Sequence, residues 1–282
     1  MLFDSSPPVT FGRRLRGAAA AVLSILLTSA IAFAGDASAA SAAWTPAKAL
    51  ASNLDNAIDL RTAVNAGGRS AVVWDKLIGV DPGHPSGIFK EAVTGPVRLG
   101  PDGLAGDEQA DRRVHGGPHK ALHHYAAENY ARLAEAFPAR AALFVPGSFG
   151  ENVSTRGWNE DTVCIGDVFR IGGATVQVCQ PRQPCWKINH KFAEDELMRF
   201  VAEHCVAGWY YRVLEGGMIA AGDAFELIGR NPEPVTLRRL WFAFRAHRPD
   251  PEELARLREI SGLSPNWVQK LDDRIAWLRQ NG

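Results

Sequence analysis

Short runs of β-forming residues fill the middle of the chain, and they restrict its fold more than any other feature of the sequence. Each run is rich in branched or aromatic residues and ends near glycine, proline or aspartate, as strands of a compact sheet do. The runs cover residues 71–74, 87–89, 95–99, 163–170, 174–179 and 225–228. This pattern predicts a β-barrel or a β-sandwich.

Two stretches inside this β-rich part have the apolar spacing of helices instead. They are residues 120–137, where Pro118 can occupy the first helical turn, and residues 194–202. We expect both to be helical excursions from the β-domain.

The pattern changes to that of helices after residues 231–234, Asn-Pro-Glu-Pro. Apolar residues then recur at helical spacings, and Ser264 followed by Pro265 suits a helix start. The segments concerned are 235–246, 251–260 and 265–280. Since 46% of the 282 residues are apolar, the chain can fill one β core and a small accessory unit. We predict a mainly β domain with some α over 71–230 and a three-helix domain over 231–282.

The N-terminus has the features of an export signal. Arg13, Arg14 and Arg16 precede an apolar run over 18–34 that ends near small residues. The run is too short and too rich in alanine for a stable membrane span. We therefore expect a signal over residues 1–40 and a periplasmic protein; a misplaced start codon would instead leave the protein in the cytoplasm.

The paired Arg13-Arg14 is similar to a twin-arginine signal, which would suit a protein exported already folded around a cofactor. Residues 41–70 are rich in alanine and polar residues, so we expect a linker there.

The charges exclude some partners. Lys and Arg total 31 and Asp and Glu total 31, so no net field draws the chain to nucleic acid or an anionic membrane. Any site for an anion must be local.

The cysteines do not have the CxxC spacing of a zinc site or a redox pair. They are Cys164, Cys179, Cys185 and Cys205. Buried, structural thiols are the usual outcome, and Cys164 and Cys179 fall in predicted strands. In an oxidising compartment a disulfide among Cys164, Cys179 and Cys205 is conceivable, although the sequence favours no pair.

Three loops carry residues suited to chemistry. Residues 103–122 are rich in glycine and contain basic side chains, a combination that can bind phosphate or a pterin but that also occurs in ordinary connections. Residues 149–155 place Glu151 beside Asn152, which can either form a turn or face a heterocycle.

The third loop is stiffened by Pro181 and Pro184 and contains Cys185 between Arg182 and Lys187. These cations favour the thiolate, which can act as a nucleophile or as a ligand for a soft or high-valent metal.

Taken in order, six segments resemble the successive motifs of the MOSC family, and their spacing is most similar to its YiiM-like branch. The segments are 86–90, 103–107, 111–117, 149–152, 165–167 and 181–185. The resemblance runs from about Val72 to the C-terminus, because proteins of this branch also end in a three-helix domain.

The resemblance implies a MOSC-type β-barrel that binds the molybdenum cofactor (molybdopterin), with Cys185 coordinating molybdenum as the catalytic residue. It implies reduction of a small N-hydroxylated substrate, such as 6-N-hydroxylaminopurine, to the amine. The protein would receive electrons from a separate flavin or iron-sulfur partner. By motif position, the candidate cofactor-binding residues are Lys90, Gly106, Asp107, Arg113, His115, Gly116, Gly117, Lys120, Glu151, Asn152, Arg182 and Lys187.

Two other functions are compatible with parts of the sequence. The chain could carry the molybdenum cofactor or its sulfur to another protein without turnover of its own. A zinc hydrolase would need ligands from the histidine-rich stretch, where His119 and His123 are four residues apart on the expected helix. The further candidates for that zinc site are His115, His124 and Glu128. Glycines break the path from His115, and Lys120 stands where a catalytic zinc motif has glutamate. The physiological substrate, the electron donor and the oligomeric state stay open.

Overall fold

A computed structural model describes residues 59–62, 88, 90–107, 109 and 115–281 of the chain. The expected signal at 1–40 and the strand at 71–74 lie outside the described residues, and so does Arg113. Of the expected linker, Asp59–Thr62 is described and forms strand β1. The other described elements belong with it to one compact unit, residues 54–282.

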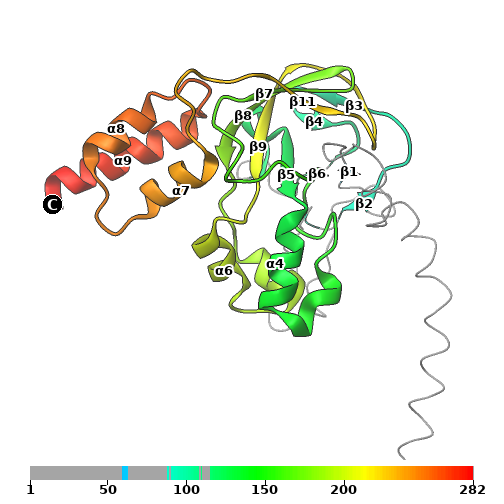
Figure 1. The fold of residues 1–282 in the computed structure, drawn as a ribbon, viewed down its shortest axis with the longest axis horizontal. Helices are drawn as coiled ribbons and strands as arrows, with labels where there is room; N and C mark the ends of the chain where they lie inside the picture. Colours follow the sequence, from blue (N-terminus) through cyan, green and yellow to red (C-terminus); the bar gives the residue numbers. More distant parts are fainter. Residues whose placement is uncertain (1–58, 63–87, 89, 108, 110–114, 282) are drawn as a thin grey trace, which may run out of the picture. The chain divides into compact units, whose positions relative to one another are not determined.

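The described strands form one large mixed sheet and one small sheet (Figure 1). The large sheet has the order β11-β7-β8-β9-β5-β6-β1-β2, and it is antiparallel except between β5 and β6. The small sheet has the order β10-β3-β4. The strands are β1 (Asp59–Thr62), β2 (Glu91–Ala92), β3 (Val97–Gly100), β4 (Gly103–Leu104), β5 (Leu122–Ala126), β6 (Val153–Thr155), β7 (Val168–Ile171), β8 (Ala174–Pro181), β9 (Trp209–Glu215), β10 (Gly217–Ile219) and β11 (Phe225–Gly229). The large sheet curls into a half-barrel, which confirms the predicted fold class of a β-barrel with helices.

The two faces of the sheet bury separate apolar cores. Leu122 and Ala126 of β5 belong to the first core, together with Trp209 and Tyr211 of β9. The alternate residue Tyr125 belongs to the second core, as expected for side chains that alternate along a strand. Neighbouring residues of β5 therefore lie in different environments.

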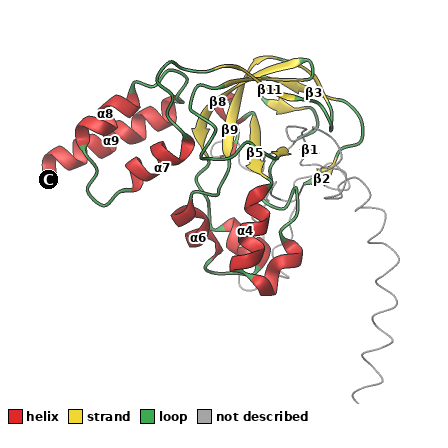
Figure 2. Cartoon of the chain, viewed as in Figure 1, coloured by secondary structure: helices red, strands yellow, loops and turns green. Residues whose placement is uncertain are grey.

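Helices lie around the second core, and Figure 2 shows α4 and α6 below the strands. The helices are α4 (Glu128–Ala136), the 3-10 helix η3 (Pro138–Leu143), α5 (Lys187–Phe192) and α6 (Leu197–His204). In that core, Phe149 stacks on Tyr125 and makes a tilted ring contact with Phe192. The expected helix at 194–202 corresponds to α6, whereas α5 was not predicted.

Three C-terminal helices follow β11. They are α7 (Leu237–Arg245), α8 (Pro251–Arg258) and α9 (Pro265–Asn281), close to the three segments that the sequence predicts. They share the first core with the sheet, and Trp241 Nε1 donates to the backbone oxygen of Ala202 over 2.8 Å. The Ser264 hydroxyl bonds back to Gln180 of β8 over 2.7 Å. The division into two domains at residue 230 stays a prediction.

The predicted helix over 120–137 is wrong in its first half. Pro118–Lys120 is a short 3-10 helix, η2, and Leu122–Ala126 is strand β5; only Glu128–Ala136 is α-helical. All five residues of β5 are buried, and the strand bonds to β9 on one side and β6 on the other. Burial on both faces outweighs the local helical spacing of these residues.

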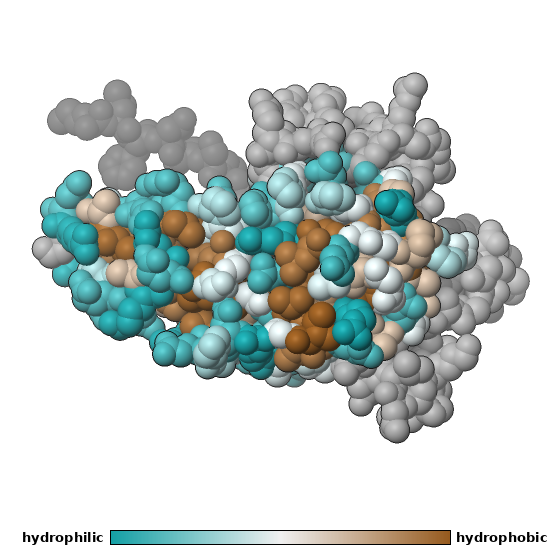
Figure 3. Space-filling model, turned by 90° about the horizontal axis from the view of Figure 1, so that it is seen from above, coloured by the Kyte–Doolittle hydropathy of each residue, from teal (hydrophilic) through white to brown (hydrophobic). Residues whose placement is uncertain are grey.

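The outer surface differs between the sheet and the helices. In Figure 3, apolar residues gather over the part of the surface above the sheet, and polar residues dominate over α8 and α9. Leu214, Met218 and Ile228 of β9, β10 and β11 are about half exposed. None of the described helices is long and apolar enough to cross a membrane.

Candidate functional site

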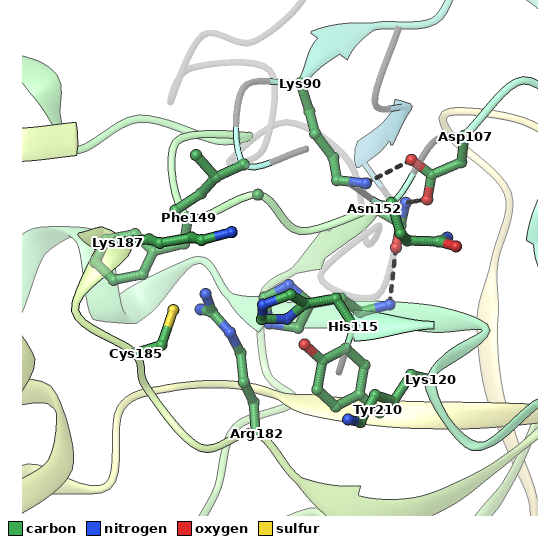
Figure 4. Close-up of a pocket in the computed structure, with 14 residues that line it drawn as sticks. Lys90, Asp107, His115, Lys120, Phe149, Asn152, Arg182, Cys185, Lys187 and Tyr210 are labelled. Atoms are coloured by element: carbon green, nitrogen blue, oxygen red, sulfur yellow. Dashed lines mark hydrogen bonds and ion pairs between the residues drawn. The ribbon is translucent and has the colours of Figure 1, made fainter. Parts of the chain in front are cut away.

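A pocket opens between His123 of β5, Tyr210 of β9 and the loop that contains Cys185 (Figure 4). We call this loop, residues 182–186 after β8, the cysteine loop. The wall of the pocket also includes the loop before β6 and the segments around Lys90 and Asp107. The lining residues are Ile88, Lys90, Asp107, Gln109, His115, Lys120, His123, Phe149, Gly150, Asn152, Arg182, Cys185, Lys187 and Tyr210. This pocket is a candidate site for a small molecule or cofactor.

Many residues singled out in the sequence come together here. Those that line the pocket are Lys90, Asp107, His115, Lys120, Asn152, Arg182, Cys185 and Lys187. Gly106, Gly116, Gly117 and Glu151 are not among the lining residues, and Arg113 lies outside the described residues.

One wall of the pocket is held by a chain of buried hydrogen bonds. Lys90 Nζ forms an ion pair with Asp107 Oδ1 at 2.7 Å, and their side chains are 6% and 3% exposed. Asn152 Nδ2 donates to the other Asp107 oxygen over 2.8 Å, while Asn152 Oδ1 accepts from the His123 amide over 2.9 Å. These hydrogen bonds fix Lys90 and Asn152 relative to β5, and Asp107 offsets the charge of Lys90 (Figure 4).

Glu151 holds the loop before β6 together from the inside. Its carboxylate is fully buried and accepts hydrogen bonds from the amides of Gly147 at 2.5 Å and Phe149 at 3.1 Å, and from the Tyr130 hydroxyl. The next turn is tight, because Gly150 has φ +72° and an added Cβ would meet Ile88 atoms at about 3.0 Å. Glu151 thus shapes the pocket from behind, while its neighbour Asn152 faces into it.

The cysteine loop begins at a paired position and ends at a helix. The Arg182 amide bonds to Gly208 over 3.0 Å, and the Ile188 amide bonds to the Cys185 carbonyl over 3.1 Å in the first turn of α5. These bonds place Cys185 between two anchored ends. Its side chain is half-buried and points into the pocket, near Arg182 and Lys187 (Figure 4).

The other cysteines have structural surroundings. All four are free thiols, and Cys164, Cys179 and Cys205 are buried. Cys179 Sγ lies 3.2 Å from the His119 carbonyl and 3.5 Å from the Tyr210 carbonyl, and burial raises its pKa to about 12. Burial also raises the pKa values of Cys164 and Cys205. Only Cys185 lines the pocket, among the described residues.

The lining of the pocket carries an excess of positive charge. Four cations line it, and Asp107 is the one carboxylate among its described lining residues. Arg182 is 7% exposed, and its Nη1 is buried without a hydrogen-bond partner within the described part of the chain. A buried guanidinium N–H without an acceptor is costly, so this group is suited to an anionic ligand in the pocket.

His123 and Tyr210 belong to the pocket although the sequence did not single out either as a cofactor ligand. They are direct partners across β5 and β9, with ring centroids 5.1 Å apart. Burial and the nearby Arg182 charge hold the pKa of His123 well below its usual range. Burial raises the pKa of Tyr210, and the nearby charge of Arg182 opposes this shift. Strand alternation could have identified both, had β5 been recognised as a strand.

The zinc alternative loses its geometric basis in this structure. His119 lies in η2 and His123 in β5, so the two are not on one helix face. The two nitrogens of His124 are engaged by Tyr211 and Thr155 at 2.9 Å each. Within the described residues no group of three His, Cys, Asp or Glu side chains could hold a metal ion.

The pocket suits the molybdenum cofactor in its chemistry. A thiol, an unpartnered buried guanidinium N–H and further cations are the groups needed to ligate a metal and to neutralise an anionic pterin phosphate. The side-chain amide of Asn152 and the ring of Phe149 offer contacts for a heterocycle.

Comparisons with known proteins identify the family of the chain. Residues 111–226 match the model of the MOSC domain. Protein YiiM of Escherichia coli (strain K12) is 40% identical over 204 residues, which are 72% of this chain and 90% of YiiM. The crystal structure of YiiM from Escherichia coli superposes with a TM-score of 0.61 at 35% identity, covering 66% of this chain and 88% of that one.

A protein named "Reductase" from Gibberella moniliformis is 35% identical over 146 residues. The match covers 51% of this chain and 26% of that longer protein.

Proposed function

The chain belongs to the MOSC domain family, and on this premise we propose that it is a molybdenum-cofactor-dependent reductase that converts N-hydroxylated compounds, such as N-hydroxylated purines, to amines. The family is named for the C-terminal domain of molybdenum cofactor sulfurase, and it is associated with that cofactor and with oxidoreductase-type activity. The substrate class and the electron donor are our proposal.

One observation carries the proposal: the thiol of Cys185 shares a cationic pocket with a buried guanidinium N–H that has no partner in the described structure. A structural cysteine in this protein looks different, as Cys179 shows, because its sulfur contacts backbone carbonyls inside the sheet. The Cys185 sulfur instead faces a space lined by charged side chains. This placement suits a metal ligand.

We assign roles to the pocket residues on the same basis. Cys185 would ligate molybdenum, and Arg182 and Lys187 would neutralise the cofactor's negative charge. Lys90, Asp107 and Asn152 form a rigid wall against which the pterin would be oriented. When bound, the cofactor supplies two-electron oxygen-atom transfer chemistry that amino acid side chains lack.

The overall reaction consumes two electrons and two protons for each N–O bond broken. The N-hydroxylated nitrogen is reduced to the amine, and the oxygen leaves as water. Tyr210 is a proton-bearing group at the pocket, because burial favours its neutral hydroxyl. We propose that it donates a hydrogen bond toward the substrate oxygen. The electrons would come from a separate flavin or iron-sulfur protein, since the four cysteines do not form the ligand set of an iron-sulfur cluster.

The decisive experiment joins metal analysis to an activity assay. Protein made in a host that synthesises the molybdenum cofactor should retain molybdenum and pterin in equal amounts. X-ray absorption should detect one protein sulfur bound to the metal. With a chemically reduced viologen as electron donor, the loaded protein should convert an N-hydroxylated purine to the aminopurine. Absence of molybdenum, or zinc in its place, would contradict the proposal.

The same preparation separates a reductase from a cofactor carrier. A carrier would transfer its cofactor to a cofactor-free molybdoenzyme and activate it, without reducing the N-hydroxylated purine.

The export signal expected over residues 1–40 also stays a prediction, and N-terminal sequencing of the mature chain is the measurement that checks it.

A further inference from the structure

A second compartment adjoins the pocket on the side of the C-terminal helices. His115, Lys120, Cys185 and Tyr210 line both spaces, so the two meet at the cysteine. The second compartment measures about 440 Å³, and Lys270 from the first turns of α9 adds a cation to its wall. A ligand reacting near Cys185 can therefore extend from the pocket toward α9.

The second compartment is basic and is placed on the far side from Lys90. Figure 4 shows Lys120 beside Tyr210, across the pocket from the Lys90–Asp107 ion pair. Lys120 and Lys270 both line the compartment, and no carboxylate lines it in the described part of the chain.

The charge of Lys120 acts on Lys270 across a partly buried space. Burial lowers the pKa of Lys270, and the charge of Lys120 lowers it further. Burial also lowers the pKa of Lys120. Two ammonium groups close enough to repel are both stabilised when an anion binds between them. A phosphate dianion is a common biological anion that two ammonium groups can bind.

We propose that Lys120 and Lys270 bind the phosphate of the substrate, so that the enzyme acts on N-hydroxylated nucleoside monophosphates in preference to the free bases or nucleosides. This inference rests on the proposed reductase function and names its substrate class. The base would lie at the Cys185 side, and the phosphate would lie in the second compartment, between the cysteine loop and α9.

Lys270 also has a structural contact that the test must take into account. Its ammonium group donates to the side-chain oxygen of Gln183 in the cysteine loop. Loss of that bond alone would disturb both a nucleoside and its monophosphate. Loss of a phosphate contact would affect the monophosphate alone, so the ratio of the two KM values distinguishes the roles.

The experiment measures kcat and KM of the loaded enzyme for an N-hydroxylated nucleoside and for its 5′-monophosphate. We expect the monophosphate KM to be at least about tenfold lower, as for one charge-assisted hydrogen bond or more. Lys270→Gln and Lys120→Gln should each reduce this preference by about tenfold, and Lys270→Arg should restore it. Arg279→Gln, which removes an exposed charge further along α9, is the matched control and should leave the preference unchanged.

A binding measurement separates the substrate's phosphate from that of the cofactor. By calorimetry, an ordinary nucleoside monophosphate should bind the loaded enzyme, more weakly at high salt, and Lys270→Gln should weaken this binding without lowering the molybdenum content. If the monophosphate binds only cofactor-free protein, or the variant loses molybdenum, the lysines serve the cofactor and the inference is wrong.

The kinetic and binding results also distinguish this inference from the proposed function. Reduction of the nucleoside and the monophosphate with equal KM values would overturn the inference and leave the reductase intact. Reduction of neither would overturn the reductase, and calorimetry would then still report whether the compartment binds phosphate.

Discussion

The two faces of β5 and β9 carry the same pair of residue types in opposite surroundings. On the pocket side, His123 lies opposite Tyr210, and both line the cavity. On the core side, His124 and Tyr211 are fully buried and bonded to each other over 2.9 Å, with Thr155 on the second imidazole nitrogen. The core pair has all its partners inside the protein, whereas the pocket pair faces a space that admits a ligand.

Cys179 and Cys185, which are six residues apart in the sequence, show the same contrast between interior and pocket. Cys179 is buried in β8, and Cys185 faces the pocket from the loop that follows. Residue type alone therefore does not indicate a role here; whether the side chain faces the pocket or the interior does. Changes on the pocket side should alter turnover, and changes on the core side should alter stability.

The largest effect should come from the cysteine pair. Cys185→Ser should reduce turnover by at least about 10³-fold, as removal of a group that acts directly in the reaction does, with stability changed by less than about 0.5 kcal/mol. Cys179→Ser is the matched variant and should retain turnover per loaded molecule. Steady-state assays and urea unfolding of both variants measure these differences. Full activity of Cys185→Ser would contradict a direct role of Cys185 in the reaction.

A smaller effect should separate the histidines. His124→Leu leaves the Tyr211 and Thr155 hydroxyls buried without their partner, so the free energy of unfolding should fall by about 2–4 kcal/mol. His123→Leu removes a long 3.4 Å contact with the Ala207 carbonyl and the ring contact with Tyr210, and it should cost about 1 kcal/mol while it changes substrate kinetics. Equal losses of stability in the two variants would contradict the difference between the faces.

The pH dependence of stability sharpens the same comparison. Burial lowers the pKa of His124 to about 3, against about 6.5 in an unfolded chain. The unfolded state therefore takes up this proton first as the pH falls. The stability that neutral His124 contributes is present above pH 6.5 and is lost between pH 6.5 and 3, by at most about 1.4 kcal/mol per pH unit.

Urea unfolding at several pH values between 7 and 4.5 measures that slope. The slope should be shallower in His124→Leu than in the unmodified protein. An unchanged slope would mean that other groups account for the acid sensitivity.

The smallest effect should come from the tyrosine hydroxyls. Tyr211→Phe removes the partner of His124 Nδ1 and should lower the free energy of unfolding by about 1 kcal/mol. Tyr210→Phe should change stability by less than about 0.5 kcal/mol and slow turnover, because its hydroxyl faces the pocket. Thermal unfolding and activity assays of both variants test this prediction. A loss of stability in Tyr210→Phe but not in Tyr211→Phe would contradict it.

Local sequence determined the elements whose stability depends on nearby residues. Strands β8 and β11 and helices α7–α9 lie close to their predicted ranges, because their periodicity and end signals are contained in each segment. The stiff loop that exposes Cys185 could also be recognised, since prolines and cations adjacent in sequence define it.

Tertiary structure decided what depends on distant partners. Leu122–Ala126 has helical spacing, yet pairing with β9 and β6 makes it a strand. That change of periodicity sends His123 to the pocket and His124 to the core. Likewise, Glu151 turns inward and Asn152 faces Asp107, 45 residues away. A sequence lists neighbours along the chain, but burial and hydrogen bonding across strands choose the face on which each one lies.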